Sequence, residues 1–236
     1  MERHKKEIDE TGFTIVNHIY SNTEINKILE VIDIAGFKGL NFRKSTDLFA
    51  IRQLLKEIPD LKAFLFTKKL KNTINDLFGP DYFLVKSIYF DKPENSNWFV
   101  SYHQDLTISV DKKVELAGFG PYTLKQDQFA VQPPINILEY NFTIRIHLDD
   151  TNEDNGALKI IANSHNRGVY RPETINWNTE KEISCNVPKG GIMIMKPLLL
   201  HSSNRTTNKQ KRRVIHLEFS NQSLPEELNW AEYFDF

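Results

Sequence analysis

The sequence lacks the features of secreted and membrane-spanning proteins. It has one cysteine, Cys185, which excludes an internal disulfide and suits a reducing compartment. Residues 1–7 are highly charged and lack the apolar core of a signal peptide, and no window approaches about 18 uninterrupted apolar residues. Lys and Arg number 30 against 31 Asp and Glu, so the net charge of −1 implies no broad attraction to nucleic acid or to an anionic membrane. We expect a cytoplasmic protein that acts on a small molecule; its oligomeric state cannot be read from the sequence.

The first third of the chain is rich in helical patterns. At 236 residues, 40% hydrophobic and 26% charged, the chain is expected to form a single domain over residues 1–236. A short strand is predicted after Gly12. Helices are predicted over residues 21–35, 47–57 and 60–78, the first capped by Ser21 or Asn22 and ended by Gly36 and Gly39.

From about residue 81 to 222 the pattern changes to short strands. Aromatic and β-branched runs separated by Gly, Pro, Asn and Asp predict strands at 82–90, 129–132, 141–148, 156–161, 184–187, 192–196 and 213–220. This spacing is typical of a mainly β jelly roll with flanking helices, which can hold a ligand in its mouth. Residues 111–128 are predicted to be irregular, and such a long loop is a candidate lid. The tail, residues 225–236, is expected to pack a short helix on the outside.

One stretch within this region, Tyr102-His-Gln-Asp-Leu106, indicates a metal site. On extended backbone, His103 and Asp105 point to the same side, because side chains alternate along a strand. An imidazole and a carboxylate can therefore reach one ion, and His201 can supply a second imidazole. Two histidines and one carboxylate with open coordination positions form the non-haem Fe(II) arrangement that activates O₂.

His-x-Asp/Glu triplets also arise by chance, and the chain has two others. They begin at His147 and His216. Several strands must separate the two halves of a barrel site, and the triplet at His103 best leaves room for them before His201. We therefore interpret the triplet at His216 as barrel wall, and His165 as a turn residue rather than a ligand.

A site that uses 2-oxoglutarate also needs a cation for the co-substrate's second carboxylate. Arginine matches a carboxylate with two parallel hydrogen bonds. The sequence offers Arg205, Arg212 and Arg213 after His201. In a strand that starts there, Arg212 shares a polar face with His216, so we predict Arg212 as the anchor, with Arg213 as its main competitor. Ser203 and Thr143 are predicted as further contacts to the co-substrate.

Together these motifs resemble the phytanoyl-CoA dioxygenase family, in the family's own order. The match spans about residues 80–220. The motifs are WFVSYHQDLT (98–107), VQPP (131–134), RIHLDD (145–150), EDNGAL (153–158), NSH (163–165), and His201 followed by Arg212-Arg213.

The resemblance implies a cupin-like double-stranded β-helix that uses Fe(II), 2-oxoglutarate and O₂ and releases succinate and CO₂. By match, His103, Asp105 and His201 take the three ligand positions, and Arg212 takes that of the keto-acid arginine. Asn204 lies slightly earlier than the family's Asn near the last histidine. Related halogenases lack the acid, so Asp105 favours hydroxylation or another oxidation.

The substrate is not carried over by the resemblance, and three hypotheses follow. The first is an oxygenase that hydroxylates a small molecule. The second is a non-catalytic jelly roll that binds a metal or ligand. The third is an oxygenase that acts on a protein or nucleic-acid side chain, against which the near-zero net charge argues weakly as far as nucleic acid is concerned.

Overall fold

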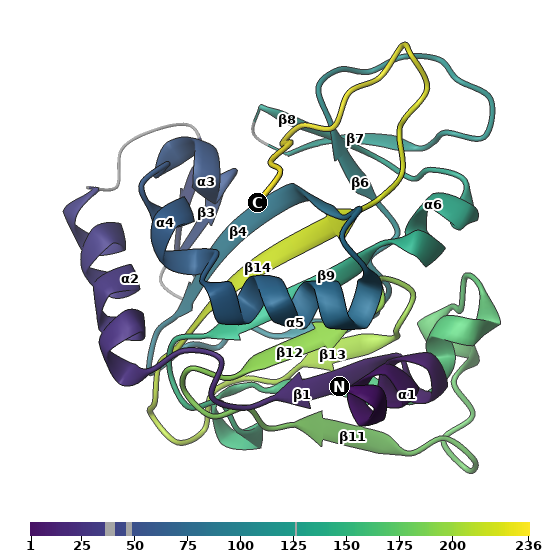
Figure 1. The fold of residues 1–236 in the computed structure, drawn as a ribbon. Helices are drawn as coiled ribbons and strands as arrows, with labels where there is room; N and C mark the ends of the chain where they lie inside the picture. Colours follow the sequence, from purple (N-terminus) through teal and green to yellow (C-terminus); the bar gives the residue numbers. More distant parts are fainter. Residues whose placement is uncertain (36–40, 46–48, 126) are drawn as a thin grey trace.

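A seven-stranded antiparallel sheet runs through the middle of the molecule (Figure 1). The computed structural model describes residues 1–35, 41–45, 49–125 and 127–236. The strand order is β1-β12-β9-β14-β4-β3-β2. The bounds are β1 (Phe13–Val16), β2 (Phe42–Lys44), β3 (Phe49–Arg52), β4 (Phe83–Lys92), β9 (Phe142–His147), β12 (Ile192–Met195) and β14 (Arg212–Ser220).

Two smaller antiparallel sheets complete the β structure. The four-stranded sheet has the order β11-β10-β13-β5, and the three-stranded sheet has the order β6-β8-β7. Their bounds are β5 (Val100–His103), β6 (Ile108–Val110), β7 (Tyr122–Lys125), β8 (Gln128–Val131), β10 (Leu158–Ile161), β11 (Glu182–Cys185) and β13 (His201–Ser203). The strands predicted from the sequence are therefore present, with their ends shifted by one or two residues.

Helices cover one face of the large sheet, where α5 crosses the strands in Figure 1. Alternation places Ile144, Ile146, Ile215 and Leu217 on this face, and they share one buried apolar cluster with the helices. The opposite face stays available for a site. The helices are α1 (Glu2–Thr11), α2 (Asn22–Ile34), α3 (Leu54–Glu57), α4 (Leu61–Leu65), α5 (Lys68–Phe78) and α6 (Ile135–Tyr140). Short 3₁₀ turns lie at Glu153–Asn155, Ser164–Arg167 and Pro172–Thr174.

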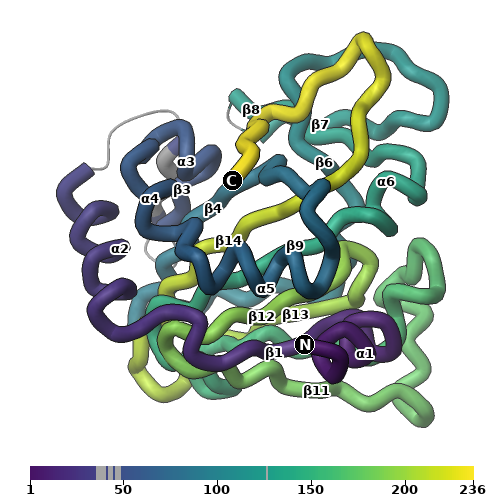
Figure 2. Tube along the Cα trace, viewed as in Figure 1, coloured from purple at the N-terminus to yellow at the C-terminus, as the bar shows by residue number. Residues whose placement is uncertain are grey.

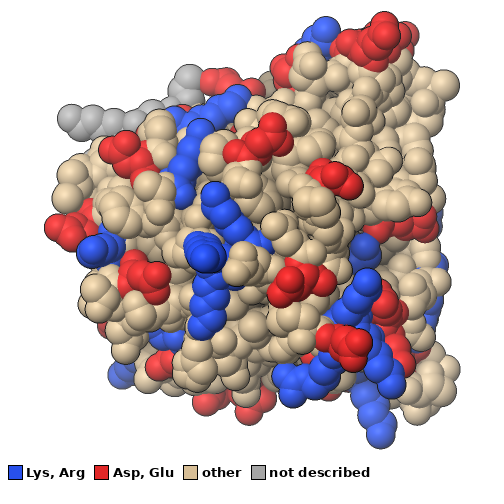
Figure 3. All heavy atoms as spheres, in the orientation of Figure 1, with Lys and Arg blue, Asp and Glu red and all other residues tan. Residues whose placement is uncertain are grey.

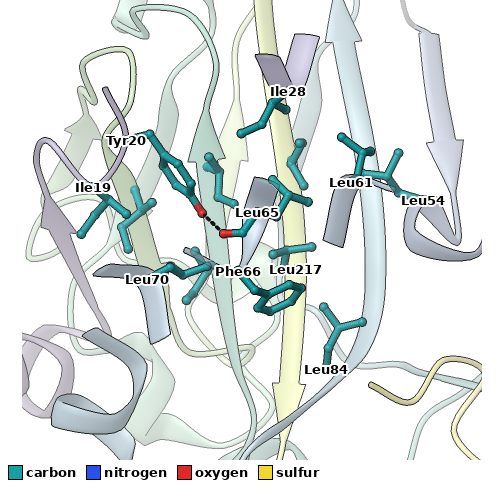
Figure 4. Packing of buried hydrophobic residues seen from close by; sticks show 14 of the residues in the cluster. Ile19, Tyr20, Ile28, Leu54, Leu61, Leu65, Phe66, Leu70, Leu84 and Leu217 are labelled. Carbon is teal, nitrogen blue, oxygen red and sulfur yellow. Dashed lines mark hydrogen bonds between the residues drawn. The ribbon is translucent and has the colours of Figure 1, made fainter. Parts of the chain in front are cut away.

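The predicted helix over residues 60–78 is in fact two helices, because the chain turns at Phe66. The Thr67 hydroxyl accepts from the Leu70 backbone N–H (3.2 Å) and starts α5. The Tyr20 hydroxyl donates to the Leu65 carbonyl at the end of α4 (2.6 Å; Figure 4). This buried bond compensates for the helical partner that the carbonyl lacks.

The prediction of a helix over residues 47–57 is wrong for its first half. Residues Phe49–Arg52 form β3, which pairs with β4, and a helix begins only at Leu54. Ladder hydrogen bonds at the edge of the large sheet have outweighed local helical periodicity. The helix predicted over 21–35 is confirmed as α2, with a capping box between Ser21 and Glu24. Gly36 and Gly39, predicted to end it, lie outside the described residues.

Residues 111–128 and the tail also differ from expectation. The predicted irregular loop contains β7, which pairs with β8. The tail forms no helix; it runs beside β6 and returns to β4, as Figure 2 shows, through the bridges Val110↔Trp230 and Leu84↔Phe234. Its backbone satisfies strand edges that would otherwise stay open, so extended structure is favoured over a helix. Helices α1 and α6 were not predicted.

On the surface, acidic and basic side chains alternate over the helix-covered side of the molecule (Figure 3). The described part of the chain has no helix long and apolar enough to cross a bilayer.

We predict that Phe142→Ala destabilises the protein strongly. The ring is fully buried and stacks between Phe78 (centroids 3.7 Å apart) and Phe219 (4.9 Å). Loss of an aromatic core side chain costs about 3–5 kcal/mol of unfolding free energy. Urea unfolding measures it, with Ile34→Ala, at a position 75% exposed, as the control expected to change stability by less than about 0.5 kcal/mol. Equal effects in the two variants would contradict this core.

A second prediction concerns pH. Burial raises the pKa of Glu232 to about 7, although its carboxylate accepts from the Ser87 N–H (2.8 Å) and hydroxyl (2.5 Å). Between about pH 4.5 and 7 the folded state therefore binds the proton that the unfolded state has lost, so this group's contribution to stability falls as pH rises. Between pH 5 and pH 7, the free energy of unfolding should therefore fall less in Glu232→Gln than in wild type. An unchanged pH dependence would refute the assignment.

Candidate metal centre

The pairing of β5 with β13 places two histidines side by side. His201 and His103 are register partners on neighbouring antiparallel strands, and their ring centroids lie 4.3 Å apart. Directly opposed residues of an antiparallel pair have their side chains on the same face. The sheet thus brings into contact two imidazoles that lie 98 positions apart in the sequence.

Each imidazole is oriented by a backbone carbonyl two residues earlier. His103 Nδ1 lies 2.9 Å from the Ser101 carbonyl, and His201 Nδ1 lies 2.8 Å from the Leu199 carbonyl. Since a carbonyl only accepts, Nδ1 carries the proton in both rings. Nε2 is left with its lone pair, as a metal ligand requires.

Asp105 completes the cluster. Its backbone N–H donates to the Pro197 carbonyl (2.9 Å), which fixes the chain just after β5. One carboxylate oxygen lies 3.8 Å from His103 Nε2 and the other 3.8 Å from His201 Nε2. One ligand atom from each of the three residues lies within 4.8 Å of the others. The described residues therefore hold a two-histidine, one-carboxylate cluster with the composition of a ferrous site.

The protonation states suit metal binding. Burial lowers the pKa of His201 to about 4, so this imidazole is neutral at pH 7. Burial favours the protonated form of Asp105, but the neighbouring imidazoles of His201, His216 and His103 favour the carboxylate more strongly and hold the pKa of Asp105 well below its usual value. A neutral imidazole and an ionised carboxylate are the forms that bind metal.

The cluster opens into a cavity of about 240 Å³ between the large sheet and the four-stranded sheet. Phe90, Arg145, Arg212 and His216 line it from the large sheet, and Lys125 of β7 lines it from residues 111–128. The remaining lining residues are Ala50, Arg52, Trp98, Val100, His103, Asp105, Leu158, His201, Ser202 and Ser203. Asp105 is the one acidic residue among them, so the cavity is suited to anions.

Comparisons with known proteins show the family and the fold of this chain. The family model described as Phytanoyl-CoA dioxygenase (PhyH) matches residues 8–214. The chain belongs to the phytanoyl-CoA dioxygenase family. No curated protein matches its sequence.

Solved structures similar to this family member show the same fold, a double-stranded β-helix, which confirms the predicted fold class. EctD from S. alaskensis with bound Fe is 15% identical, with TM-score 0.71, and the match covers 93% of this chain and 76% of that one. HygX from Streptomyces hygroscopicus, with nickel and 2-oxoglutarate bound, is 13% identical, with TM-score 0.67 and coverage of 100% and 96%. SnoN, an alpha-ketoglutarate-dependent epimerase from nogalamycin biosynthesis, is 13% identical, with TM-score 0.69 and coverage of 93% and 82%.

The two candidate arginines point to opposite sides of β14. Arg212 is buried and lines the cavity; its Nη1 donates to the Gly156 carbonyl (2.6 Å), and its Nε has no partner among the described residues. Arg213 instead forms an ion pair with Asp149 on the other side of the sheet (2.7 Å). Arg212 is thus the arginine with hydrogen-bonding capacity left for a ligand.

The other predicted contacts lie at different distances from the cavity. Ser203 lines it, and its hydroxyl donates to the same Gly156 carbonyl (2.9 Å). Thr143 is fully buried and is not among the lining residues, and its hydroxyl has no partner among the described residues.

The remaining histidines lie outside the cluster. His147 bonds to the Thr151 hydroxyl (2.7 Å), and His216 bonds to Glu218 (2.9 Å) in the barrel wall. His165 lies in a 3₁₀ turn beside a second cavity. The sequence analysis did not predict a role for two buried cations, Arg145 and Lys92. The polar face of the strand over residues 141–148 was the one sequence signal that could have pointed to Arg145.

We predict that the protein binds one divalent metal ion per chain through this cluster. Mn²⁺ titration of wild type by calorimetry should give a single site, and His201→Ala should weaken it about tenfold or more, since even loss of a supporting residue costs about 10–100-fold. His18→Asn is the matched control, because His18 is exposed and Asn tolerates its left-handed backbone (φ 59°). Equal Mn²⁺ affinity in His201→Ala and wild type would rule the cluster out.

Proposed function

We propose that this protein is an Fe(II)- and 2-oxoglutarate-dependent oxygenase of a small molecule. The observation that carries the proposal is the convergence of His103, Asp105 and His201 in the lining of a cation-rich cavity. These residues fit a ferrous ion, since their donors are two imidazole nitrogens and one carboxylate oxygen, and no thiolate lines the cavity. When bound, the ion supplies O₂ activation coupled to oxidation of the keto acid.

The protein's own residues would bind and orient the reactants. His103, Asp105 and His201 would occupy three positions on the metal and leave the others for the keto acid and O₂. Arg212 would hold the far carboxylate of 2-oxoglutarate, supported by Ser203. Burial lowers the pKa of Arg212 to about 9, so the guanidinium is still charged at pH 7. A buried charge without an ion-pair partner is costly, and an incoming carboxylate would remove that cost.

For the reaction itself, we propose hydroxylation of the substrate. Asp105 would take a metal position that a halide could otherwise use, and this supports transfer of oxygen to the substrate. Similar structures include a carbocyclase, SnoK, and an epimerase, SnoN, each described as alpha-ketoglutarate dependent. Ring closure or epimerisation at a C–H bond is therefore the second candidate reaction, and the mass of the product separates the two.

We expect wild type, with added Fe(II), to convert 2-oxoglutarate to succinate, slowly without substrate and faster with it. Arg212→Gln should raise the KM for 2-oxoglutarate about 100-fold, equivalent to about 3 kcal/mol for a lost charged pair. His103→Ala should abolish succinate formation.

The control is Arg171→Gln, an exposed arginine away from the cavity lining, which should behave as wild type. A screen of small molecules would then give products heavier by one oxygen atom for hydroxylation. Absence of Fe(II)-dependent succinate from wild type under all conditions would favour a non-catalytic binding protein.

A further inference from the structure

A second buried arginine lines the cavity beside the metal cluster. Arg145 lies on β9, on the side of the large sheet that faces the four-stranded sheet, and only 7% of its surface is exposed. It lines the same cavity as His103, Asp105 and His201. Asp105 raises the pKa of Arg145 electrostatically, although burial, the larger effect, lowers it to about 10. Its guanidinium is therefore charged at pH 7 and within electrostatic range of the metal-binding carboxylate.

Within the described residues, the Arg145 guanidinium has no carboxylate in ion-pair contact. Arg145 Nη1 approaches His216 Nδ1 (3.3 Å), and its Nε has no partner among the described residues. The nearby Glu218 is already matched, since its carboxylate bonds to His216 (2.9 Å) and forms an ion pair with Lys86 (2.7 Å). No ion pair of Arg145 occurs in the described part of the chain. A buried guanidinium in this state is poised for an anion.

Arg145 and Arg212 address different parts of the cavity. Arg145 is the register partner of His216, which lies four residues beyond Arg212 along β14. Their backbones are therefore about 13 Å apart along the strands, at about 3.3 Å per residue. Arg212 reaches the wall formed by Gly156 and Ser203, whereas the Arg145 guanidinium reaches His216. Both side chains nevertheless line one cavity, and the charge of Arg145 helps to lower the pKa of Arg212.

We infer that Arg145 holds the carboxylate next to the keto group of 2-oxoglutarate, so that two arginines clamp the two ends of the co-substrate. This inference rests on the proposed function. 2-Oxoglutarate carries two carboxylates, and the one next to the keto group would lie near the metal-binding residues, which include Asp105. The cavity offers two buried guanidiniums with free hydrogen-bonding capacity, one for each end. Arg145 is thus a positioning residue that orients the keto acid on the metal and offsets the charge its carboxylate brings next to Asp105.

Calorimetry with two keto acids separates the ends of the clamp. Mn²⁺-loaded protein is titrated with 2-oxoglutarate and with 2-oxopentanoate, which has the same chain length but no far carboxylate. Arg212→Gln should weaken 2-oxoglutarate to about the level of 2-oxopentanoate and leave 2-oxopentanoate unchanged. Arg145→Gln should weaken both keto acids by a similar factor of about tenfold or more, because both share the near carboxylate. Arg145→Lys should restore part of this affinity, since it keeps the charge and loses the fork.

Each other result has a defined meaning. If Arg145→Gln binds both keto acids as wild type does, or weakens 2-oxoglutarate alone, Arg145 does not hold the near carboxylate. Unchanged keto-acid affinity with weakened substrate binding would assign Arg145 to an anionic group of the substrate instead. If wild type binds Mn²⁺ but neither keto acid, the proposed function itself fails. Melting temperatures of all variants show whether they fold.

A test without variants guards against misfolding. In a crystal structure of wild type with Mn²⁺ and N-oxalylglycine, the inert analogue of 2-oxoglutarate, the Arg145 guanidinium should lie within about 3.2 Å of the metal-bound carboxylate. A guanidinium still directed only at His216, with no contact to the analogue, would overturn the inference.

Discussion

The antiparallel pairing of β5 with β13 is the contact on which the whole site depends. It sets His103 opposite His201 and places the carboxylate of Asp105, two residues past the end of β5, 3.8 Å from each Nε2 atom. Backbone groups hold the three side chains in place. The Asp105 N–H donates to the Pro197 carbonyl, and the Nδ1 atoms of His103 and His201 bond to backbone carbonyls. A shift of one residue in register would turn one imidazole to the opposite face of the sheet and dismantle the cluster.

Charge is the second constraint, and it shapes the interior of the barrel. Most buried charges in protein interiors are paired. In the described part of the chain, however, Arg145 and Arg212 line this cavity without an ion-pair partner. Lys92, the register partner of Arg212 on β4, donates to the Asn204 carbonyl. Burial, together with the charge of Arg212, lowers the pKa of Lys92 to about 7, so this amine readily loses its charge. Unpaired buried cations are costly, and this cost supports the proposal that the cavity binds a dicarboxylate co-substrate.

Local sequence patterns predicted most strands and the three residues that form the His-Asp-His cluster. They did so because period-two alternation and the spacing of His103 and Asp105 are properties of the sequence itself. They failed where distant partners decide. Residues Phe49–Arg52 became a strand because β4 offered an edge, and the tail stayed extended because Leu84 and Val110 offered pairing. The turn at Phe66 ended a helix whose periodicity continued.

The sequence also did not predict whether the polar face of a strand lies toward solvent or toward a cavity. Residues 141–148 show that the strand has one polar side, but only the assembled sheets show that this side, with Arg145, meets the cavity and not water. Likewise, alternation separated Arg212 from Arg213, while the ion pair of Arg213 with Asp149 emerges only from the fold.

The most direct test of the central claim is anomalous X-ray diffraction at the iron absorption edge, from crystals loaded with Fe(II) without oxygen. The account predicts one strong peak at bonding distance from Nε2 of His103, Nε2 of His201 and a carboxylate oxygen of Asp105. An iron peak at any other position, or none at a concentration of Fe(II) that saturates the protein in solution, would contradict it.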